Sequence, residues 1–557
     1  MEDLMILPRT FRSLSNHFKP INLIFSKLLK PFKWDRHLWW HMDFYEEIVQ
    51  KINSGTIGNK RELQNEKIKL ARKAGLDYIP GDVEILNSGH HIDSEYHNLL
   101  RIKNTRTVSG VAVVAAMTSP ERCPHGKCIY CPGGVDNNSP QAYTGHEPAA
   151  LRGRNNSYDP YNEVFSRLKQ IDLIGHDTSK VDLIIMGGTF TARPLEYQEW
   201  FVKGCLDAMN RSISSDLQEA IKINETAERR CIGLTVETKP DWFFEREIDA
   251  ALSYGTTKVE LGVQNISEEI LRKNMRGHGI AEIVKSTQLA RDAGLKIVYH
   301  LMPGMPGSTF EQDLESFRTM INDNSYKPDM LKIYPTLVVK GTTIYRMWKN
   351  GDYVPMDTDT AVDLIVEMMK IMPPWIRIQR MQRDIPVKFI EAGVKRSDIR
   401  NMVEDRIRDE KIQTGEIRIR EIANDSFGNS EFSMIRRDYD ASGGKEIFLS
   451  YEDSNGKMIG FVRLRIPSEL AHRKEMASSS VIREIKVFGN VVPIGSHSEQ
   501  KWQHRGMGSN LLREAERISR EEFRMERILV ISGIGVREYF RARGYSQLGP
   551  YMARKIC

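Results

Sequence analysis

The chain has 557 residues, which at roughly 150 residues per domain predicts two to four domains. Its 40% hydrophobic residues are ordinary for a globular protein, and its formal net charge of +6 permits a nucleic-acid partner without requiring one. Six cysteines, three of them clustered at 123, 128 and 131, exclude a secreted disulfide framework and favour a metal site in a reducing compartment, the cytoplasm.

The N-terminal segment 1–41 carries lysines interleaved with apolar residues. Such a segment can lie on a membrane surface or touch RNA, but Pro20 and Pro31 interrupt it and no small-residue cleavage site follows. We interpret it as a basic extension without an assigned role. The next region, 42–100, is expected to be a helical tRNA-binding part. No uncharged apolar run of about 18 residues occurs, so no membrane span is predicted.

Short β-rich runs alternate with helical stretches between about 106 and 335. Repeated strand–helix units predict a parallel sheet, and six of them indicate a partial or full β/α barrel, assigned to 101–375. The expected strands are 111–115, 181–186, 231–236, 258–263, 296–300 and 330–334.

A second α/β domain of mixed sheet is predicted at 436–557, after a connector at 376–435 that opens near Pro373-Pro374. Its first two strands flank a turn-rich segment and predict a hairpin. The expected elements are strands 447–451, 458–465, 481–488 and 527–531, with helices at 506–524 and 537–543.

The densest chemistry lies at Cys123, Cys128 and Cys131, on a loop after the first barrel strand. Three thiolates on one loop can each hold one iron of a [4Fe-4S] cluster and leave the fourth iron open. A zinc site is the alternative, but it wants four ligands, and His125 between two closely spaced cysteines is a cramped fourth. We therefore predict an iron–sulfur cluster.

The cysteine loop, with Tyr130 before the third cysteine, resembles the radical S-adenosylmethionine (SAM) superfamily, although its spacing is four residues and then two rather than three and then two. The resemblance implies that the open iron binds SAM, whose one-electron cleavage gives a radical able to attack an unactivated C–H bond. Polar groups at the ends of later strands are the expected SAM contacts, because barrel ligands bind there and glycine permits close backbone approach. These residues are Gly187, Gly188, Thr189, Glu237, Glu260 and Gln264.

A glycine-rich turn opens a helix in the second domain. Backbone N–H groups at such a turn form an anion site for a pyrophosphate. The pattern, after a strand that ends at 484–487, resembles the acyl-CoA loop of Gcn5-related acetyltransferases. The expected acetyl-CoA contacts are Glu484, Ile485, Lys486, Val487, Gln503, His504, Arg505, Gly506, Met507, Gly508 and Ser509.

Several longer motifs resemble the catalytic subunit of Elongator and its archaeal and bacterial stand-alone relatives, from about residue 43 to the C-terminus. They are Cys123-Pro-His, Cys128-Ile-Tyr-Cys-Pro-Gly-Gly, 157–161, 332–338, 436–439 and 502–508. The resemblance implies carboxymethylation at C5 of uridine 34 in tRNA. In this hypothesis the radical takes a hydrogen from the methyl group of acetyl-CoA, and the resulting carbon radical adds to the uracil.

Two features depart from that family. Members often carry a cysteine-based zinc site in the connector, but residues 404–422 contain no cysteine, so we predict no zinc. The position four residues before Gly544, where an acetyltransferase tyrosine commonly protonates the departing thiolate, is Phe540. Tyr539 lies about 100° away on the helix and is the remaining candidate acid. Lys332, at a strand end, is a candidate for a proton or electron role near the cluster and SAM.

The partner predicted is the anticodon stem-loop of tRNA, whose wobble base must leave its stack. The candidate backbone contacts are Arg101, Lys103, Arg106, Arg152, Arg154 and Arg167. The electron donor and a homodimer are left open by the sequence. The alternative function is a protein lysine acetyltransferase with a structural iron–sulfur region.

Overall fold

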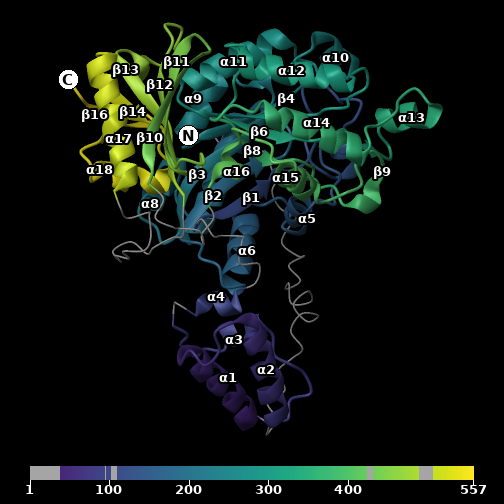
Figure 1. Cartoon of the computed structure of the whole chain (residues 1–557), viewed down its shortest axis with the longest axis vertical. Helices are drawn as coiled ribbons and strands as arrows, with labels where there is room; N and C mark the ends of the chain where they lie inside the picture. Colours follow the sequence, from purple (N-terminus) through teal and green to yellow (C-terminus); the bar gives the residue numbers. More distant parts are fainter. Residues whose placement is uncertain (1–37, 94–95, 102–109, 423–430, 489–505) are drawn as a thin grey trace, which may run out of the picture. The chain divides into compact units, whose positions relative to one another are not determined.

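The computed structural model describes residues 38–93, 96–101, 110–422, 431–488 and 506–557 (Figure 1). Residues 1–37 of the basic extension therefore lie outside the described part. The chain divides into two compact units, Met1–Ile102 and Lys103–Cys557. Within the described ranges, no helix is both long enough and apolar enough to cross a bilayer.

The first unit is helical, as predicted. Its helices are α1 (Leu38–Asn53), α2 (Lys60–Lys73), α3 (Asp82–Leu86) and α4 (His97–Leu100). The chain breaks between α1 and α2, because Gly55 adopts a positive φ of 71° and Asn59 caps a new helix by accepting from the N–H groups of Arg61 and Glu62.

The second unit begins with a seven-stranded sheet in which every neighbouring pair is parallel. Its strands, in spatial order, are β1 (Ala112–Met117), β2 (Lys180–Met186), β3 (Arg230–Thr238), β4 (Lys258–Gln264), β5 (Lys296–Leu301), β6 (Met330–Ile333) and β8 (Arg377–Arg380). Because no described pairing joins β8 to β1, the barrel is open. All six predicted strands are present. The seventh, β8, lies beyond residue 375, so the sheet extends into the expected connector.

Helices follow these strands, as crossover connections between parallel neighbours require. They are α5 (Pro148–Asn155), α6 (Pro160–Leu173), α7 (Leu195–Asn210), α8 (Leu217–Asn224), α9 (Glu245–Ser253), α10 (Glu268–Lys273), α11 (Ile280–Asp292), α12 (Phe310–Asn322), α13 (Thr343–Asn350) and α14 (Thr358–Lys370). A small antiparallel pair, β7 (Val338–Val339) and β9 (Ile390–Ala392), and the helices α15 (Ile399–Asp409) and α16 (Ile417–Arg420) follow.

The C-terminal part of this unit is a mixed seven-stranded sheet in the order β10-β11-β12-β13-β14-β16-β15. The predicted hairpin is confirmed as the antiparallel pair β11–β12, whereas β10, β15 and β16 were not predicted. The elements are β10 (Ser433–Ala441), β11 (Gly444–Glu452), β12 (Met458–Ile466), β13 (Ser479–Val487), α17 (Met507–Arg517), β14 (Arg527–Val530), α18 (Arg537–Arg541), β15 (Ser546–Leu548) and β16 (Tyr551–Lys555). The expected long helix ends early, because a π-helical turn, Ile518–Glu522, replaces its last part.

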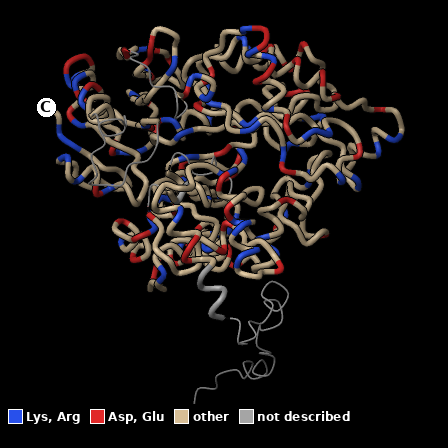
Figure 2. The backbone as a smooth tube through the Cα atoms, turned by 60° about the horizontal axis from the view of Figure 1, so that its bottom comes forward, with Lys and Arg blue, Asp and Glu red and all other residues tan. Residues whose placement is uncertain are grey.

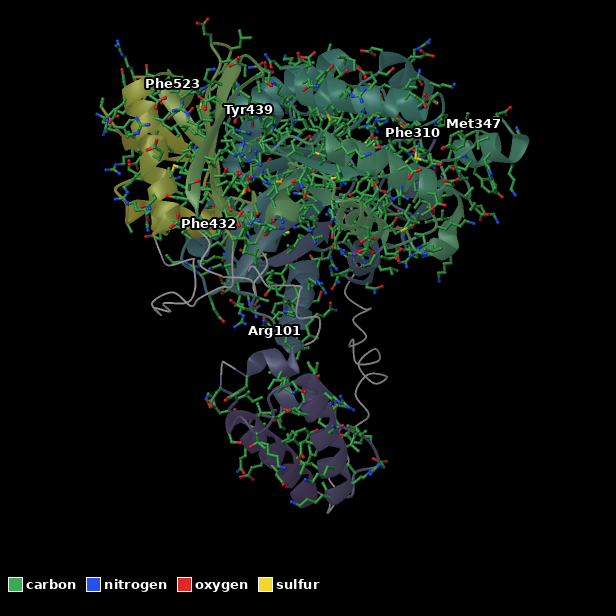
Figure 3. All side chains as sticks on the ribbon, in the orientation of Figure 1. Arg101, Phe310, Met347, Phe432, Tyr439 and Phe523 are labelled. Carbon is green, nitrogen blue, oxygen red and sulfur yellow. The ribbon has the colours of Figure 1, made fainter. Side chains whose placement is uncertain are left out.

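The two sheets of the second unit are joined by packing and by buried charge. Tyr439 of β10 (Figure 3) stacks on Trp375, which precedes β8, with ring centroids 4.1 Å apart. Seven charged side chains from both sheet layers, each at most 1% exposed, form one network. They are Arg291, Asp292, Asp329, Glu446, Arg463, Arg465 and Arg483.

Asp329, at the start of β6, connects the barrel to the second sheet through Arg483. One oxygen of its carboxylate accepts from Arg483 Nη1 at 2.8 Å, and the other contacts Nη2. Arg483 also reaches Glu446 Oε2 at 3.2 Å. Burial by itself disfavours the charged carboxylate, but Arg483 and its neighbouring arginines hold the pKa of Asp329 far below its usual range.

We expect Asp329→Asn to destabilise the second unit by about 3–5 kcal/mol, because it removes one carboxylate shared by several buried arginines and leaves their positive charge only partly compensated. The measurement is the urea midpoint of unfolding. Asp363→Asn is the matched control, since Asp363 is half exposed and pairs with Arg406 at the surface. That change is expected to cost less than about 1 kcal/mol. Equal midpoints for the two variants would show that the network does not hold the sheets together.

Candidate functional site

The three clustered cysteines lie on the loop that follows β1, at the carboxyl end of the parallel sheet. Cys128 and Cys131 are buried, Cys123 is half-buried, and all three are free thiols. They line one cavity together with the expected strand-end residues Gly188, Thr189, Glu237, Glu260 and Gln264. The cavity leaves about 1080 Å³ free of protein atoms, counting its open mouth. These residues are distant in sequence but lie together, because the carboxyl ends of parallel strands meet at the same edge of the sheet.

Hydrogen-bond donors converge on the cysteine sulfurs. Cys131 Sγ accepts from Gln141 Nε2 at 3.1 Å and from the backbone N–H of Ala142 at 3.2 Å. Cys128 Sγ accepts from Arg276 Nη1 at 3.3 Å. Several N–H donors around sulfur suit thiolates that hold a metal, because a neutral thiol is only a weak acceptor. The donor set therefore fits an iron–sulfur cluster.

Burial opposes the charged form of two of these thiols. It raises the pKa of Cys123 and of Cys131, and the neighbouring sulfurs raise both further. The thiolate forms of these two residues therefore need a bound cation to compensate their charge. His125 Nε2 lies 3.3 Å from Cys128 Sγ, and burial lowers the pKa of His125 to about 3, so its ring is neutral at physiological pH.

Gly187 and Gly188 bring the turn after β2 close to the cysteine loop. Their φ angles are 138° and 90°, a region that favours glycine. A Cβ on Gly187 would lie 1.9 Å from Thr118 Oγ1, and one on Gly188 would lie 3.2 Å from Gln141 Cβ. Thr189 Oγ1 lies 3.5 Å from Cys123 Sγ. The packing of this turn therefore requires glycine at both positions, and the approach of SAM to them stays a prediction.

The expected carboxylates Glu237 and Glu260 lie on neighbouring strands, β3 and β4. Tyr143 donates its hydroxyl to Glu237 Oε2 at 2.7 Å, and Glu260 Oε2 lies 3.0 Å from His300 Nε2. Burial raises the pKa of Glu237. Burial also opposes the charge of Glu260, but Lys332 and His300 outweigh it and hold the pKa of Glu260 well below its usual range.

Lys332 lies behind these carboxylates and does not line the cavity. Its Nζ contacts Glu260 Oε2 and lies 3.8 Å from Glu237 Oε1. Burial opposes its charge, but Glu260 together with nearby tyrosine and glutamate groups raises its pKa above the ordinary value. This lysine therefore keeps its proton, and any influence of it on the cavity acts through the two glutamates.

Unsatisfied polar atoms in the cavity point to a polar ligand. Glu260 Oε1, Gln264 Oε1 and His125 Nδ1 are buried without a hydrogen-bond partner. A buried acceptor without a partner costs about 1–3 kcal/mol, so such groups in a cavity await a donor. Gln264 also has a φ of 71°, a strained conformation for a non-glycine residue of the kind that clusters at ligand sites.

The structure adds lining residues that the sequence did not single out. They are Gln141, Tyr143, Arg276, His300, Tyr334, Arg380 and Arg383. The strand-end rule was a usable signal for His300, at the end of β5, and for Tyr334, directly after β6. Arg276 comes from the loop between α10 and α11, and no local pattern marks it.

The glycine-rich turn of the second domain begins α17. Gly506 is its N-cap with a φ of 75°, and the first backbone bond of the helix runs from Asn510 N–H to Gly506 C=O. The N–H groups of Met507, Gly508 and Ser509 precede that bond and belong to the donors that a helix start leaves without internal partners. This start fits an anion. Gln503, His504 and Arg505 lie outside the described residues.

Within the described ranges, the expected strand end at 484–487 pairs with a neighbouring strand on one side only. Its residues pair with β12 on one side, from Arg463–Glu484 to Gly460–Val487. The parallel register of β13 with β14 ends earlier, at Ile482–Val530. Backbone donors and acceptors of this segment therefore face the space where β14 has diverged, which fits an extended ligand such as the arm of acetyl-CoA. The carboxylate of Glu484 already accepts a hydrogen bond, from Arg463 Nε to its Oε2 at 2.9 Å.

Tyr539 and Phe540, neighbours on α18, differ in their burial. Phe540 is 2% exposed and packs edge-on against Tyr545 in the core. Tyr539 is 37% exposed, and its hydroxyl lies 4.0 Å from where a Cβ on Gly508 would be. The tyrosine is thus on the side of the α17 start, so it remains the candidate acid, while Phe540 serves the core.

The expected RNA-contacting arginines divide between the two units. Arg152 donates to the Ala115 carbonyl at 2.5 Å, so it is tied to β1, whereas Arg167 contacts Gln170 at the surface. Lys103 and Arg106 lie outside the described residues, and Arg101 (Figure 3) belongs to the first unit. Basic and acidic residues are interspersed along the described chain (Figure 2). The distribution of charge along the backbone therefore does not mark an RNA-binding face.

Comparison with protein families agrees with this geometry. Residues 117–320 match the radical SAM superfamily, and residues 328–409 match the Radical SAM C-terminal domain. The first range contains the cysteine loop and the strands from β2 to β5, and the second contains β6 and β8.

Individual relatives extend over nearly the whole chain. The tRNA uridine(34) acetyltransferase of Methanocaldococcus jannaschii is 46% identical, over 92% of this chain and 97% of its own length. Human Elongator complex protein 3 is 40% identical, over 91% and 96%. The solved structure of archaeal Methanocaldococcus infernus Elp3 with an N-terminal deletion matches with a TM-score of 0.71 and 44% identity, over 81% of this chain and all of that one.

Proposed function

The chain belongs to the family of tRNA uridine(34) acetyltransferases and Elongator complex protein 3 and is a radical SAM enzyme, and we propose that it carboxymethylates C5 of wobble uridine 34 in tRNA. The observation that carries this proposal is the pairing of two sites in one compact unit. The three cysteines and the strand-end carboxylates share a cavity, and the glycine start of α17 provides an acyl-CoA-type anion site.

We assign the predicted site residues to two cofactors, an iron–sulfur cluster and SAM. Cys123, Cys128 and Cys131 would hold the [4Fe-4S] cluster, and the strand-end residues from Gly187 to Gln264 would hold SAM. Bound there, the two cofactors supply removal of a hydrogen atom from an unactivated C–H bond. After the carbon radical has added to uracil C5, loss of the C5 hydrogen releases a proton and one electron. Glu237, whose pKa burial raises, is the lining carboxylate suited to accept the proton, and the oxidised cluster would be the acceptor for the electron.

The second site would hold acetyl-CoA as the carbon donor. Its pyrophosphate fits the N–H groups at the start of α17, and its arm fits the backbone edge at 484–487. Tyr539 is the residue placed to protonate the CoA thiolate when water releases the carboxymethyl group. These assignments rest on the positions of Gly506, Gly508 and Tyr539 described above.

The proposed partner is the anticodon stem-loop of tRNA, with uridine 34 splayed out to reach the cavity. Arg380 and Arg383 line the cavity, and Arg154 and Arg167 lie on α5 and α6 of the same unit. The proposed compartment is the cytoplasm, whose reducing conditions keep the cysteines available to iron.

A protein lysine acetyltransferase is the alternative function. It would use the α17 site alone and leave the hydrogen-bonded cysteine sulfurs and the unsatisfied cavity atoms without a role. The two functions differ in what triggers consumption of acetyl-CoA. We expect the purified protein to hydrolyse acetyl-CoA only when tRNA is added, and a lysine peptide to have no effect. Stimulation by peptide and none by tRNA would favour the alternative.

Isotope transfer tests the chemistry directly. Supplied with SAM, a one-electron reductant, tRNA and acetyl-CoA deuterated in its methyl group, the enzyme is expected to place deuterium in 5′-deoxyadenosine while it forms carboxymethyluridine. Mass spectrometry of both products is the measurement. Modified uridine with unlabelled 5′-deoxyadenosine would show that the hydrogen comes from another atom.

A further inference from the structure

Arg276 is a buried cation that directly contacts a cluster-binding cysteine. It lies between α10 and α11 and is 6% exposed. Its Nη1 donates to Cys128 Sγ at 3.3 Å, and its Nη2 donates to the Gly262 carbonyl. The guanidinium is therefore fixed at two points, one on the end of β4 and one on the cysteine loop.

This arginine differs from the other deeply buried arginines in its partners. Arg291, Arg463, Arg465 and Arg483 each form ion pairs with aspartate or glutamate. Among the described residues, none of the ion pairs joins Arg276 to a carboxylate. A buried charge without an opposite charge is strongly destabilising, so the counter-charge of Arg276 must come from the cysteine sulfurs.

Other cationic or titratable groups near the cysteines are neutral or bonded to other partners. Arg383 acts on Cys131 through its charge, but its guanidinium donates its hydrogen bond to the Ala142 carbonyl. Lys239 pairs with Asp241 at 3.0 Å. His278 is buried, and desolvation together with Arg276 lowers its pKa to about 2, so it carries no charge. Arg276 is thus the fixed positive charge in contact with a ligand sulfur in the described part of the chain.

We propose that Arg276 is a positioning residue that raises the reduction potential of the cluster, an inference that rests on the proposed iron–sulfur site. Reduction adds one electron from a low-potential one-electron donor, which is itself oxidised by one electron, and Arg276 keeps its protons throughout. The added negative charge is stabilised by the nearby guanidinium, and an N–H donor to a ligand sulfur acts in the same direction. Arg276 therefore makes the first electron transfer easier.

The test is a redox titration of the anaerobically reconstituted full chain, followed by electron paramagnetic resonance of the reduced cluster without SAM. At the wild-type midpoint, Arg276→Gln is expected to lower the ratio of reduced to oxidised cluster about tenfold, which equals about 59 mV for a one-electron couple. Arg276→Lys keeps the charge but loses one of the two hydrogen bonds that fix the side chain. Its reduction potential is therefore expected between those of the wild type and Arg276→Gln.

Arg229→Gln is the matched control, because Arg229 is also buried but pairs with Asp172 and does not line the cavity. It is expected to keep the wild-type potential. A full cluster with unchanged potential in Arg276→Gln overturns the proposal. If that variant binds less iron, the potential of its cluster-loaded fraction decides, and a wild-type potential there overturns the proposal equally. Wild-type protein without any cluster would instead refute the proposed function.

Discussion

Cys128→Ser is expected to lose the iron–sulfur cluster and, with it, all formation of 5′-deoxyadenosine and carboxymethyluridine. Cys128 is buried, lines the cavity and accepts from Arg276, so a serine there removes one of three iron ligands and leaves a buried guanidinium without its counter-charge. The measurements are iron and sulfide per chain and the two products by mass spectrometry.

Cys205 provides the matched control. It lies in α7, is fully buried in the barrel core and does not line the cavity. Alanine is the better replacement there, because a serine hydroxyl would enter an apolar core without a partner. Cys205→Ala is expected to keep full iron content and both products. Equal iron in Cys128→Ser and Cys205→Ala would refute the assignment of the three cysteines.

Binding of tRNA separates loss of the cluster from loss of the fold. Phosphate contacts come from basic side chains, so Cys131→Ser is expected to bind tRNA with wild-type affinity while it makes neither product. A filter-binding titration measures this. Loss of tRNA binding together with the cluster would show that the cysteine loop also supports the RNA-binding surface.

Gly506→Glu is expected to abolish acetyl-CoA binding while the cluster stays intact. The new carboxylate would stand at the start of α17, where the pyrophosphate is proposed to lie. Two like charges about 4 Å apart repel by about 4 kcal/mol near a protein surface, which corresponds to roughly a thousandfold loss of affinity. A negative side chain suits a helix start, so α17 itself should persist. Calorimetry with acetyl-CoA is the measurement.

Backbone strain at Gly506 requires its own control, because its φ of 75° is unfavourable for most side chains. Asparagine tolerates this conformation and carries no charge. Among the described residues other than its chain neighbours, no atom lies within 4 Å of a Cβ at this position, so none of them blocks the side chain. Gly506→Asn is expected to keep most of the affinity. Equal losses of affinity in the two variants would mean that backbone strain, rather than charge, is responsible. Undiminished affinity in Gly506→Glu would show that the turn only caps the helix and does not bind the pyrophosphate.

The sequence by itself determined the features that are local in the chain. The spacing of Cys123, Cys128 and Cys131 places three ligands on one loop whatever surrounds it. Alternating strands and helices fix a parallel sheet, and its carboxyl ends then collect Glu237 and Glu260 near that loop. The glycine pattern at Gly506 likewise predicts a helix start, since it depends on backbone conformation over a few residues.

Only the tertiary structure decided which distant side chains complete the sites. Arg276 contacts Cys128 across 148 positions of sequence, and Tyr143 contacts Glu237 across 94. Neither residue belongs to a periodic pattern, so no local signal identifies it. The structure also changes the role expected of Lys332. Because its ammonium group is buried against two glutamates, it can influence the cavity only through them. Burial and pairing are properties of the packed chain, because they depend on the residues that folding brings alongside.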